Sequence, residues 1–557
     1  MSETRRGLPL TRARLEQIFP VLTPSQINRV EAHGHVRAVQ TGDLLVEQGD
    51  TNIPFFVVMT GEIEIVRPFG AQETLVTVHG SGQFTGEVNT LSGRRSIFRA
   101  RVTKAGKIIE LNHKQMLSLI QTDAELSDIL MRAFILRRVE LIAAGVGDIV
   151  FIGSTYSADT LRIKEFLMRN GHPYSYIDVE RDPDVQNLLD SFQISANELP
   201  VLIYRGQLAL RNPNNQQLAE CLGFNESIDQ TQVRDLVIIG AGPSGLAAAV
   251  YGASEGLDVL VLETGSPGGQ AGSSSRIENY LGFPTGISGQ ELAGRAYNQA
   301  QKFGAVMLII KVTRLVCDHK PYEVAVEKGP PVLTRAIVIA TGAEYRKPQC
   351  KELPRFEGAG IYYSATFMEA QLCSGEEVIV VGGGNAAGQA AIFLAQSTKR
   401  VHMLVRSNGL EDNMSRYLIR RIEDTSTIVV HTHTEISKLD GGDHLESVRW
   451  RNNQTEESEE HKIRHVFLMT GATPNTRWLD GCVLLDDKGF IKTGTDLSPE
   501  NLSTTRWPLA RPPYLLETSL PGVFAVGDVR SGSVKRVASA VGEGSIAISF
   551  IHKVLQE

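Results

Sequence analysis

The spacing of hydrophobic and polar positions changes several times along the chain, and each change predicts a different kind of element. Between residues 36 and 110, short apolar segments separated by glycines alternate with polar positions, as in Glu-Ile-Glu-Ile at residues 62–65. This period of two with regular turns predicts an antiparallel roll or barrel. Apolar residues at helical spacing then run over residues 114–138, which predicts a helical tail.

The next region, residues 148–224, alternates between strand-like and helical patterns. Apolar runs at residues 148–153, 174–180 and 199–206 predict strands, helical segments lie between them, and a closing helix follows. The β-α-β-α-β order predicts a small α/β domain.

Residues 235–263 predict a strand, a glycine turn, an alanine-rich helix and a second strand ending at Glu263. Gly240 makes the tight turn, Gly242 lets the backbone approach a pyrophosphate, and Gly245 lets the helix pack on the strand. The helix N-terminus receives the phosphates. Glu263 is placed to accept hydrogen bonds from an adenosine ribose.

A second unit of the same kind occupies residues 377–406. Gly382, Gly384 and Ala387 repeat the glycine turn, and Arg406 ends the second strand. The pattern predicts a second dinucleotide-binding domain.

Composition and charge exclude several classes of function. The 557 residues carry 56 Lys and Arg against 63 Asp and Glu, and this net charge of -7 argues against a nucleic-acid-binding surface. The longest apolar stretches are short and broken by charges, so no membrane span is expected. The N-terminus lacks the apolar core of a secretory signal. We therefore expect a cytoplasmic protein of roughly three to five domains.

The five cysteines are scattered along the chain, and none of them belongs to a Cys-x-x-Cys pair. This usage suits a reducing compartment. The cysteines are Cys221, Cys317, Cys350, Cys373 and Cys482.

The order of elements in the N-terminal region resembles the cyclic-nucleotide-binding domain. The resemblance implies that Gly86, Glu87 and Arg94 hold the cyclic phosphate and the ribose. The cassette is shorter than in that family, and Arg95 replaces its small residue. A roll retained for contact with the rest of the protein, without a nucleotide, is the alternative.

The region from Asp148 to Phe224 resembles the thioredoxin fold of glutaredoxins. Leu199-Pro200 stands where that family keeps its cis-proline. The turn that would carry the active dithiol reads Ser-Thr-Tyr-Ser at residues 154–157, so thiol exchange at this turn is excluded. Cys221 is expected to be packed. The domain is interpreted either as a docking module for a thioredoxin-like or glutathione-like partner or as a structural spacer.

From Asp235 to Glu557 the chain closely resembles the low-molecular-weight thioredoxin reductases. The motifs are Gly-Gly-Gln at residues 268–270, Ile-Glu-Asn-Tyr at 277–280, Ala-Thr-Gly-Ala at 340–343 and Gly-Asp at 527–528. The resemblance implies an FAD domain interrupted by a nicotinamide domain, and a homodimer. The implied FAD-binding residues are Gly240, Gly242, Pro243, Ser244, Gly245, Glu263, Gly269, Gln270, Asn279, Thr341, Gly342, Gly527, Asp528, Lys535, Arg536 and Val537. The implied NAD(P)-binding residues are Gly382, Gly384, Asn385, Ala386 and Arg406.

The choice of nicotinamide depends on the residues after the second strand of that domain. Relatives that use NADPH place several arginines there, whereas here Arg406 is followed by Ser407, and Glu411 occupies a position that is basic in them. One arginine can pair with a 2′-phosphate, but a nearby carboxylate opposes it. The resemblance favours NADPH, and NADH stays open.

The chain departs from the family at the redox-active dithiol. Ala365 and Met368 stand where thioredoxin reductases carry their two cysteines, so no catalytic thiol is assigned. We expect an NAD(P)H-dependent flavoprotein oxidoreductase whose acceptor is a small molecule, a quinone or a one-electron protein. The alternative is a regulatory flavoprotein that senses a nucleotide or redox state. A third hypothesis is a disulfide reductase that uses Cys373.

The predicted fold is multidomain: a β-roll with helices, an α/β thioredoxin-like fold and two Rossmann-like α/β domains. His431, His433 and His444 lack metal-ligand spacing and are interpreted as surface residues. The predicted boundaries are 1–145 for the roll, 146–226 for the thioredoxin-like domain, 233–345 and 479–557 for the FAD domain, and 346–478 for the NAD(P) domain.

Overall fold

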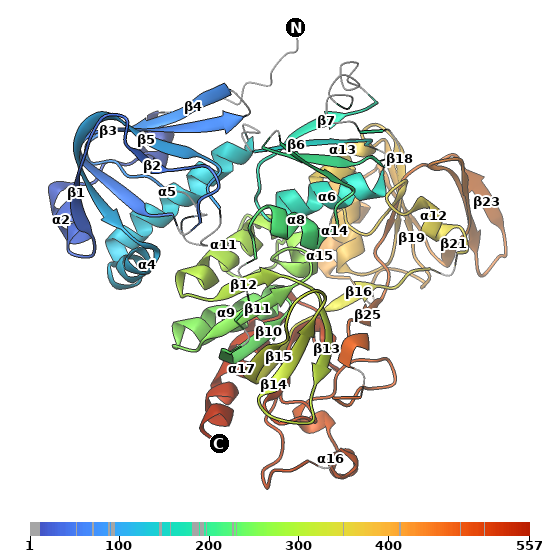
Figure 1. The fold of residues 1–557 in the computed structure, drawn as a ribbon. Helices are drawn as coiled ribbons and strands as arrows, with labels where there is room; N and C mark the ends of the chain where they lie inside the picture. Colours follow the sequence, from blue (N-terminus) through green and yellow to red (C-terminus); the bar gives the residue numbers. More distant parts are fainter. Residues whose placement is uncertain are drawn as a thin grey trace. The chain divides into compact units, whose positions relative to one another are not determined.

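The computed structural model describes most of the chain (Figure 1). The chain divides into two compact units. The first unit comprises Met1–Thr155, Arg162–Ser227 and Asn298–Ile310, and the second comprises Tyr156–Leu161, Ile228–Tyr297 and Lys311–Glu557. The described residues are 12–51, 53–69, 72–86, 90, 95–143, 148–155, 157–180, 189, 194–195, 198–205, 207–225, 228–229, 231–348, 350–411, 414–479, 481–505 and 507–557.

The first unit begins with the predicted antiparallel roll. Its strands follow the order β1-β5-β3-β4, and β2 pairs with β5. The long strands arise from the alternating segments, and register shifts between β3 and β5 bend the sheet into a roll. The strands are β1 (His35–Val39), β2 (Leu44–Val46), β3 (Phe55–Phe69), β4 (Gln72–His79) and β5 (Arg99–Leu111).

Helices cover one side of the roll. The predicted helical tail forms two helices, because Asn112 caps the first through a reciprocal bond with Gln115 and the chain turns at Asp123. Phe55, Phe84 and Phe134 pack their rings together in the core between roll and helix. The helices are α1 (Arg12–Ile18), α2 (Pro24–Glu31), α4 (His113–Thr122) and α5 (Ala124–Ala143).

The thioredoxin-like region forms a four-stranded sheet in the order β7-β6-β8-β9. Strand β6 is parallel to β7, as the β-α-β connection requires, and antiparallel to β8, which forms a hairpin with β9. The Leu199–Pro200 bond is cis, as predicted. The predicted helix at residues 182–192 lies outside the described residues except for Leu189. The elements are β6 (Ile149–Gly153), α6 (Ala158–Arg169), β7 (Ser175–Asp178), β8 (Val201–Tyr204), β9 (Leu208–Arg211) and α8 (Asn215–Cys221).

Strand β12 (Val306–Ile309) groups with this region, which the sequence did not indicate. Ile309 is buried in the same core as Phe151. The amide of Asn225 binds the backbone of Ile309 twice: its Oδ1 accepts from the N–H at 2.7 Å, and its Nδ2 donates to the carbonyl at 3.0 Å.

The second unit contains a sheet with the order β11-β10-β15-β14-β13, and β26 pairs with β15. Strand β10 is parallel to both neighbours, so Leu262 and Ile339 flank Ile239 at the carboxyl edge. Helices α9 and α17 pack against each other and against this sheet. Gly544 of α17 lies so close to the carbonyl of Ser244 in α9 that a Cβ at position 544 would collide with it. The elements are β10 (Val233–Ile239), α9 (Pro243–Ser254), β11 (Val259–Glu263), α10 (Gly269–Gly272), α11 (Gly289–Lys302), β13 (Val312–Val316), β14 (Tyr322–Val326), β15 (Val332–Ile339), β26 (Val523–Ala525) and α17 (Val537–Gln556).

A parallel sheet with the order β17-β24-β18-β19-β20 is inserted between β15 and β26, and an antiparallel sheet β21-β22-β23 lies beside it. Alternate residues of β18 belong to two hydrophobic cores on its opposite faces. The elements are α12 (Leu353–Phe356), β17 (Ile361–Tyr362), α13 (Phe367–Leu372), β18 (Glu377–Val381), α14 (Asn385–Leu394), β19 (Arg400–Leu404), α15 (Arg416–Glu423), β20 (Ile428–His431), β21 (Thr434–Gly441), β22 (Leu445–Asn452), β23 (Ser458–His461) and β24 (Val466–Leu468).

Two short strands, β16 (Ala343–Tyr345) and β25 (Ala472–Pro474), form an antiparallel pair that carries the chain into and out of the inserted domain. The return segment continues through short helical turns toward β26. These are η2 (Arg477–Leu479), η3 (Gly494–Asp496), α16 (Pro499–Thr504) and, after β26, η4 (Gly527–Val529).

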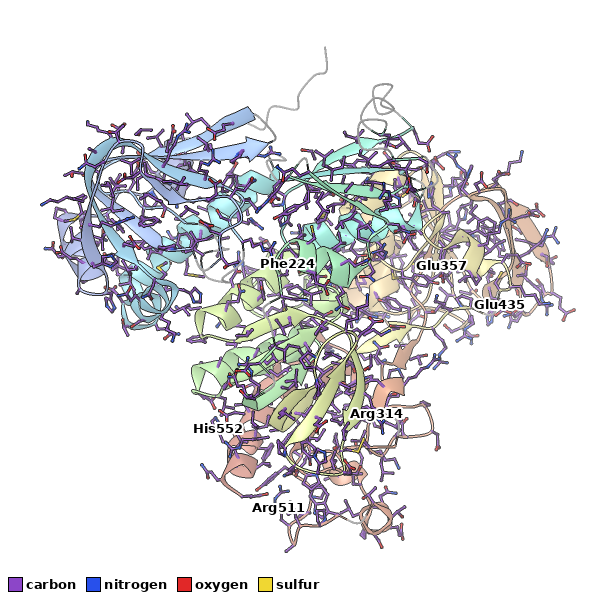
Figure 2. The ribbon with its side chains drawn as sticks, in the orientation of Figure 1. Phe224, Arg314, Glu357, Glu435, Arg511 and His552 are labelled. Atoms are coloured by element: carbon purple, nitrogen blue, oxygen red, sulfur yellow. A yellow bond between two sulfur atoms is a disulfide. The ribbon has the colours of Figure 1, made fainter. Side chains whose placement is uncertain are left out.

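A disulfide joins Cys317 and Cys482, with a Cα–Cα distance of 5.9 Å, a pairing that the spacing of the cysteines did not predict. Cys317 directly follows β13, the strand that carries Arg314 in Figure 2. A sequence separation of 165 residues concealed this pairing, because only the folded sheet brings the two segments together. Cys221, Cys350 and Cys373 are free. Among the described residues, no helix combines the length and apolarity needed to cross a membrane.

His79, at the end of β4, makes the roll sensitive to acid. Its side chain is 2% exposed, and burial together with the charge of Arg137 lowers its pKa to about 3. The unfolded chain therefore binds a proton more readily, so this contribution to stability is complete above about pH 6.5 and is lost as the pH falls toward 3. We expect the free energy of unfolding of the roll to be about 2 kcal/mol lower at pH 5 than above pH 6.5. Hydrogen exchange of residues 72–79 measures this loss.

His79→Phe should remove this pH dependence. His35→Phe is the matched control, because His35 is an exposed histidine of the same roll. Equal acid sensitivity of the wild type and His79→Phe would contradict the assignment.

Candidate functional site

The first glycine turn follows β10 and leads into α9. Gly240 has a φ of +104°, and a Cβ there would collide with the carbonyl of Ala340 at the end of β15. A Cβ at Gly245 would collide with the carbonyl of Gly240. Both positions therefore require glycine, as the spacing predicted.

Gly242 differs from these two glycines, because the nearest atom to a Cβ there is the Cα of Gly269 at 4.0 Å. It caps α9 without a side-chain hydrogen bond, and Pro243 and Ser244 open the helix. The backbone N–H groups of this first turn consequently face a cradle between the turn and Gly269. The cradle fits a pyrophosphate, which a helix N-terminus attracts.

Glu263 ends β11 beside this cradle. Its Oε2 accepts a hydrogen bond from the Ala241 N–H at 2.7 Å, and its Oε1 accepts one from the Gly265 N–H at 2.9 Å. Oε1 also accepts from the Thr264 hydroxyl at 3.4 Å, whereas Oε2 keeps a second lone pair that can accept from a ribose.

Gln270, Thr341 and Gly342 come together where β15 leads into the crossover strands. Gln270 Nε2 donates to the carbonyl of Ala343. Gly342 has a φ of +63°, with no atom within 4 Å of an added Cβ. Asn279 is exposed on the loop that follows α10.

Asn475 is a residue of this site that the sequence reasoning missed. Its Nδ2 donates to the Thr341 carbonyl at 3.0 Å, and the Thr341 hydroxyl donates to the Asn475 carbonyl at 2.9 Å. A signal was present, because the Thr-Gly-Ala triplet at 341–343 recurs at 470–472, just before Asn475. The two triplets lead into the paired strands β16 and β25.

The loop after β26 brings Gly527 and Asp528 to the same edge of the sheet. Gly527 has a φ of +74°, and its N–H donates to Glu543 of α17 at 2.7 Å. Burial raises the pKa of Asp528, and Lys535 partly offsets that effect. Glu543 also forms an ion pair with Arg530 at 2.7 Å. The sequence did not reveal its role, because its position in a helix does not indicate that it binds the Gly527 turn.

Lys535 and Arg536 are exposed at the start of α17, and Val537 is half-buried. Arg536 caps this 20-residue helix without a side-chain hydrogen bond. The partial positive charge of the helix N-terminus therefore adds to the charges of the two side chains.

The second glycine turn repeats this geometry between β18 and α14. Gly382 has a φ of +140°, and a Cβ there would collide with the carbonyl of Met469. Gly384 caps α14, and Ala386 is exposed in its first turn. Asn385 Oδ1 accepts from the Ser415 N–H at 2.7 Å, so this side chain fixes a neighbouring loop.

Arg406 is exposed after β19, and Glu411 follows it in the same loop. Ser407 donates to the carbonyl of Gly409 at 2.8 Å and tightens the loop. Glu411 and Glu423 line an adjacent cavity of about 270 Å³. These carboxylates oppose negative charge in that cavity.

The positions of the missing dithiol are occupied by a helix cap. Ala365 is 6% exposed in the core, and Met368 lies in α13, which Thr366 caps with Glu369. Cys373 is buried on one face of the inserted sheet, and Cys350 packs against the opposite face.

The free cysteines are poor nucleophiles. Burial raises the pKa of Cys373 to about 12 and that of Cys221 to about 11, and it also raises the pKa of Cys350. Thiols with raised pKa values supply little thiolate at neutral pH.

In the roll, Gly86 has a φ of +99°, and its carbonyl accepts a hydrogen bond from Arg137 of α5 at 2.7 Å. Arg137 lies over the rings of Phe19 and Phe84. The other predicted cassette residues, Glu87 and Arg94, lie outside the described residues.

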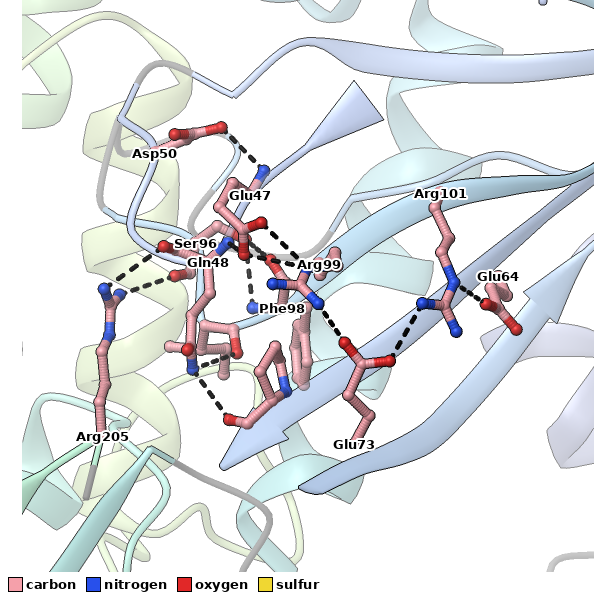
Figure 3. Close-up of polar contacts among 12 residues, drawn as sticks. Glu47, Gln48, Asp50, Glu64, Glu73, Ser96, Phe98, Arg99, Arg101 and Arg205 are labelled. Atoms are coloured by element: carbon pink, nitrogen blue, oxygen red, sulfur yellow. Dashed lines mark hydrogen bonds and ion pairs between the residues drawn. The ribbon is translucent and has the colours of Figure 1, made fainter. Parts of the chain in front are cut away.

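Arg205 of the thioredoxin-like region reaches the roll at Gln48 and Ser96 (Figure 3). It donates to the carbonyl of Ser96 at 3.1 Å and to that of Gln48 at 3.4 Å. It also lies 3.4 Å from the buried carboxylate of Asp148. Burial alone would raise the pKa of Asp148, but the hydrogen bond to His172 and the charge of Arg205 lower it.

The histidines group differently from the sequence expectation. His431 contacts His402, with 3.0 Å between Nε2 and Nδ1, and both pack around Trp450 with His461. Within the described part of the chain, no group of three or more His, Cys, Asp or Glu side chains is arranged to hold a metal ion.

Two family models match the chain: "Pyridine nucleotide-disulphide oxidoreductase" over residues 234–544 and "Cyclic nucleotide-binding domain" over residues 36–123. The thioredoxin reductase of Bacillus subtilis is 30% identical over 340 residues, which cover 59% of this chain and 97% of the relative. The thioredoxin reductase of Mycoplasma genitalium is 31% identical over 317 residues, which cover 57% of this chain and 93% of the relative.

The crystal structure of Lactococcus lactis thioredoxin reductase in its FR conformation has a TM-score of 0.52 and 28% identity. The match covers 58% of this chain and 99% of the Lactococcus lactis chain. These similarities confirm the predicted fold class and the predicted resemblances to the thioredoxin reductases and the cyclic-nucleotide-binding domain.

Gly242→Val tests the cradle. The added side chain has room among the protein atoms but fills the space before α9, so we expect FAD affinity to fall tenfold or more, ~1.4 kcal/mol. Fluorescence titration of the apoprotein measures the affinity.

Gly294→Ala is the control, because no atom lies within 4 Å of a Cβ added there. An unchanged FAD affinity in a folded Gly242→Val protein would refute the assignment of the cradle.

Proposed function

This chain belongs to the pyridine nucleotide-disulphide oxidoreductases, and we propose on that basis that it is an FAD-dependent NAD(P)H oxidoreductase that works without a vicinal dithiol. The observation that carries the proposal is the contrast within the second unit. Two complete glycine turns stand in one unit, while Ala365 and Met368 leave the usual thiol positions without sulfhydryl groups.

The residues around the first turn would hold FAD. The cradle at Gly242 would receive the pyrophosphate, and Glu263 would bind the adenosine ribose. Gln270, Thr341 and Asp528 would border the rest of the cofactor. The second turn, from Gly382 to Arg406, would hold the nicotinamide nucleotide.

When bound, FAD supplies two-electron chemistry, accepting a hydride from NAD(P)H and releasing the electrons to an acceptor. The chain's own contribution is electrostatic. The N-terminus of α17, with Lys535 and Arg536, favours negative charge at this edge of the sheet.

The acceptor is proposed to be a small molecule, a quinone or a one-electron protein. Cys373 does not replace the dithiol, because it is fully buried and its pKa is raised to about 12. The hypothesis of a disulfide reductase based on Cys373 therefore finds no support in its surroundings.

The coenzyme is proposed to be NADPH, on the basis of the family resemblance and of Arg406. NADH is the alternative, which Glu411 and Glu423 favour because they line the neighbouring cavity.

Anaerobic stopped-flow absorbance of the holoprotein with NADPH, and separately with NADH, tests this function. We expect fast loss of flavin absorbance with one nucleotide and slower loss with the other. Arg406→Ala should weaken the binding of NADPH by about tenfold, because one charged contact is lost, and should leave the binding of NADH unchanged.

Cys373→Ser is the control variant, and its flavin reduction and turnover should match the wild type. Absence of bleaching with both nucleotides would sink the proposed function. Loss of turnover in Cys373→Ser would instead revive a thiol mechanism.

A second candidate function is regulation by a nucleotide, which the Arg205 contacts favour. Arg205 binds the carbonyl of Ser96 in the segment that follows the cassette, and it also contacts the buried Asp148. A cyclic nucleotide that moves this segment would therefore change the thioredoxin-like region. The domain boundaries, a homodimer and a cytoplasmic location remain our proposals.

Hydrogen exchange of the full chain with and without cyclic AMP or cyclic GMP tests this second function. We expect a ligand to change protection in β6 and β8, and Arg205→Ala to abolish that change while cyclic-nucleotide binding persists. No calorimetric binding of either nucleotide would eliminate the sensor function.

A further inference from the structure

The Cys317–Cys482 disulfide closes a ring around the inserted domain. Its sequence separation of 165 residues encloses β16, the whole inserted sheet and β25. Both cysteines are half-buried, so neither sulfur belongs to a sealed core. By contrast, Cys373 is fully buried.

Cys317 directly follows β13, the outer strand of the first sheet. Strands β13 and β15 are both antiparallel to β14, so they run in the same direction. Val316 pairs with Glu323, and Tyr322 pairs with Thr334, so Cys317 lies level with the first half of β15, seven residues before Thr341.

Cys482 lies on the return segment that follows β25. This segment begins at Asn475, whose amide and carbonyl bind Thr341. Beyond the disulfide, the Leu484 N–H donates to Ser519 at 2.9 Å, and Asp486 accepts from Ser531 at 2.8 Å.

The disulfide consequently anchors a segment that runs between two parts of the proposed FAD site. One part is Thr341–Gly342, and the other is the loop after Gly527–Asp528, because Ile491 N–H donates to the Val529 carbonyl at 3.0 Å. Opening the disulfide frees the anchor without breaking either set of hydrogen bonds.

The reduced state is also accommodated locally. Cys482 Sγ lies 3.2 Å from the carbonyl oxygen of Leu315 in β13. A thiol at Cys482 can donate to that oxygen, so reduction leaves a satisfied S–H rather than a buried orphan.

We propose that Cys317–Cys482 is a thiol–disulfide exchange site of this protein, which takes a dithiol as its reductant. A thiolate of the dithiol attacks one sulfur, which forms a mixed disulfide and releases the other cysteine as a thiol. The second thiol of the reductant then attacks the mixed disulfide, which closes the disulfide of the reductant and releases the second protein thiol. The products are two protein thiols and the oxidised dithiol, so two electrons and two protons pass from reductant to protein. The opened site loosens the connection between the first sheet and the inserted domain.

The first experiment counts thiols in the native holoprotein. Reduced dithiothreitol, and separately reduced thioredoxin, are added without denaturant, followed by maleimide labelling and peptide mass spectrometry. We expect labelling at Cys317 and Cys482 to rise from near zero to near completion within minutes while FAD stays bound. Oxidised dithiothreitol should restore the disulfide.

Cys350→Ser is the matched control and should show the same rise, because Cys350 is a free cysteine that takes no part in the disulfide. Disulfide opening only in urea would overturn the proposal in favour of a static crosslink. Permanent labelling of both thiols, with no disulfide formed by the oxidant, would also overturn it.

The second experiment measures the consequence for the inserted domain and, in part, rests on the proposed function. Limited proteolysis of residues 475–491 should increase at least threefold on reduction, and Cys482→Ser should show the increased rate at every redox poise. The rate of flavin reduction by NADPH or NADH should change at least threefold between the two redox states. Equal proteolysis in both states would refute the loosening.

The two proposals fail separately. If neither nicotinamide reduces the flavin in either redox state, the oxidoreductase function fails, while the thiol count still decides the exchange site. If flavin reduction is fast and the disulfide resists native reduction, only the exchange site fails.

Discussion

The close approach of a strand-end carbonyl to a glycine turn is the constraint on which the second unit depends. At Gly240 the carbonyl of Ala340 occupies the space that any Cβ would need, and at Gly382 the carbonyl of Met469 does the same. Each contact brings three features together at one edge of the sheet: the end of a parallel strand, a turn and the N-terminus of a helix. The backbone N–H groups of the turn are thereby left facing a ligand rather than a side chain.

Those two carbonyls also begin the segments that connect the two sheets. Ala340 leads into the Thr-Gly-Ala triplet at 341–343, and Met469 leads into the same triplet at 470–472. The strands β16 and β25 that follow pair antiparallel, and Asn475 ties the return segment to Thr341. The same strand ends that shape the nucleotide turns therefore also set the path between the domains.

The chemistry of sulfur in this protein follows from burial and from topology. The positions of the family's dithiol contain Ala365 and Met368 around a helix cap, and Cys373 is withdrawn into the core. The paired cysteines lie instead at the end of β13 and on the return segment, whose hydrogen bonds reach Thr341 and the loop after Gly527. The thiol–disulfide chemistry proposed here thus lies outside the inserted domain's own core.

The sequence by itself determined the local elements and the residue types that the turns require. The period of two in the roll, the glycine spacing at residues 240–245 and the terminal Glu263 each express a backbone or burial requirement that acts over a few residues. The absence of thiols at Ala365 and Met368 could also be read directly, because a side chain either carries a sulfhydryl or does not. Tertiary structure decided the rest: the Cys317–Cys482 bond, the reciprocal contacts of Asn475 with Thr341, the partnership of Glu543 with Gly527, and the Arg205 contact with Ser96. These pairs lie far apart or on different elements, and no periodicity links them, because they meet only where strand ends and loops converge in the folded chain.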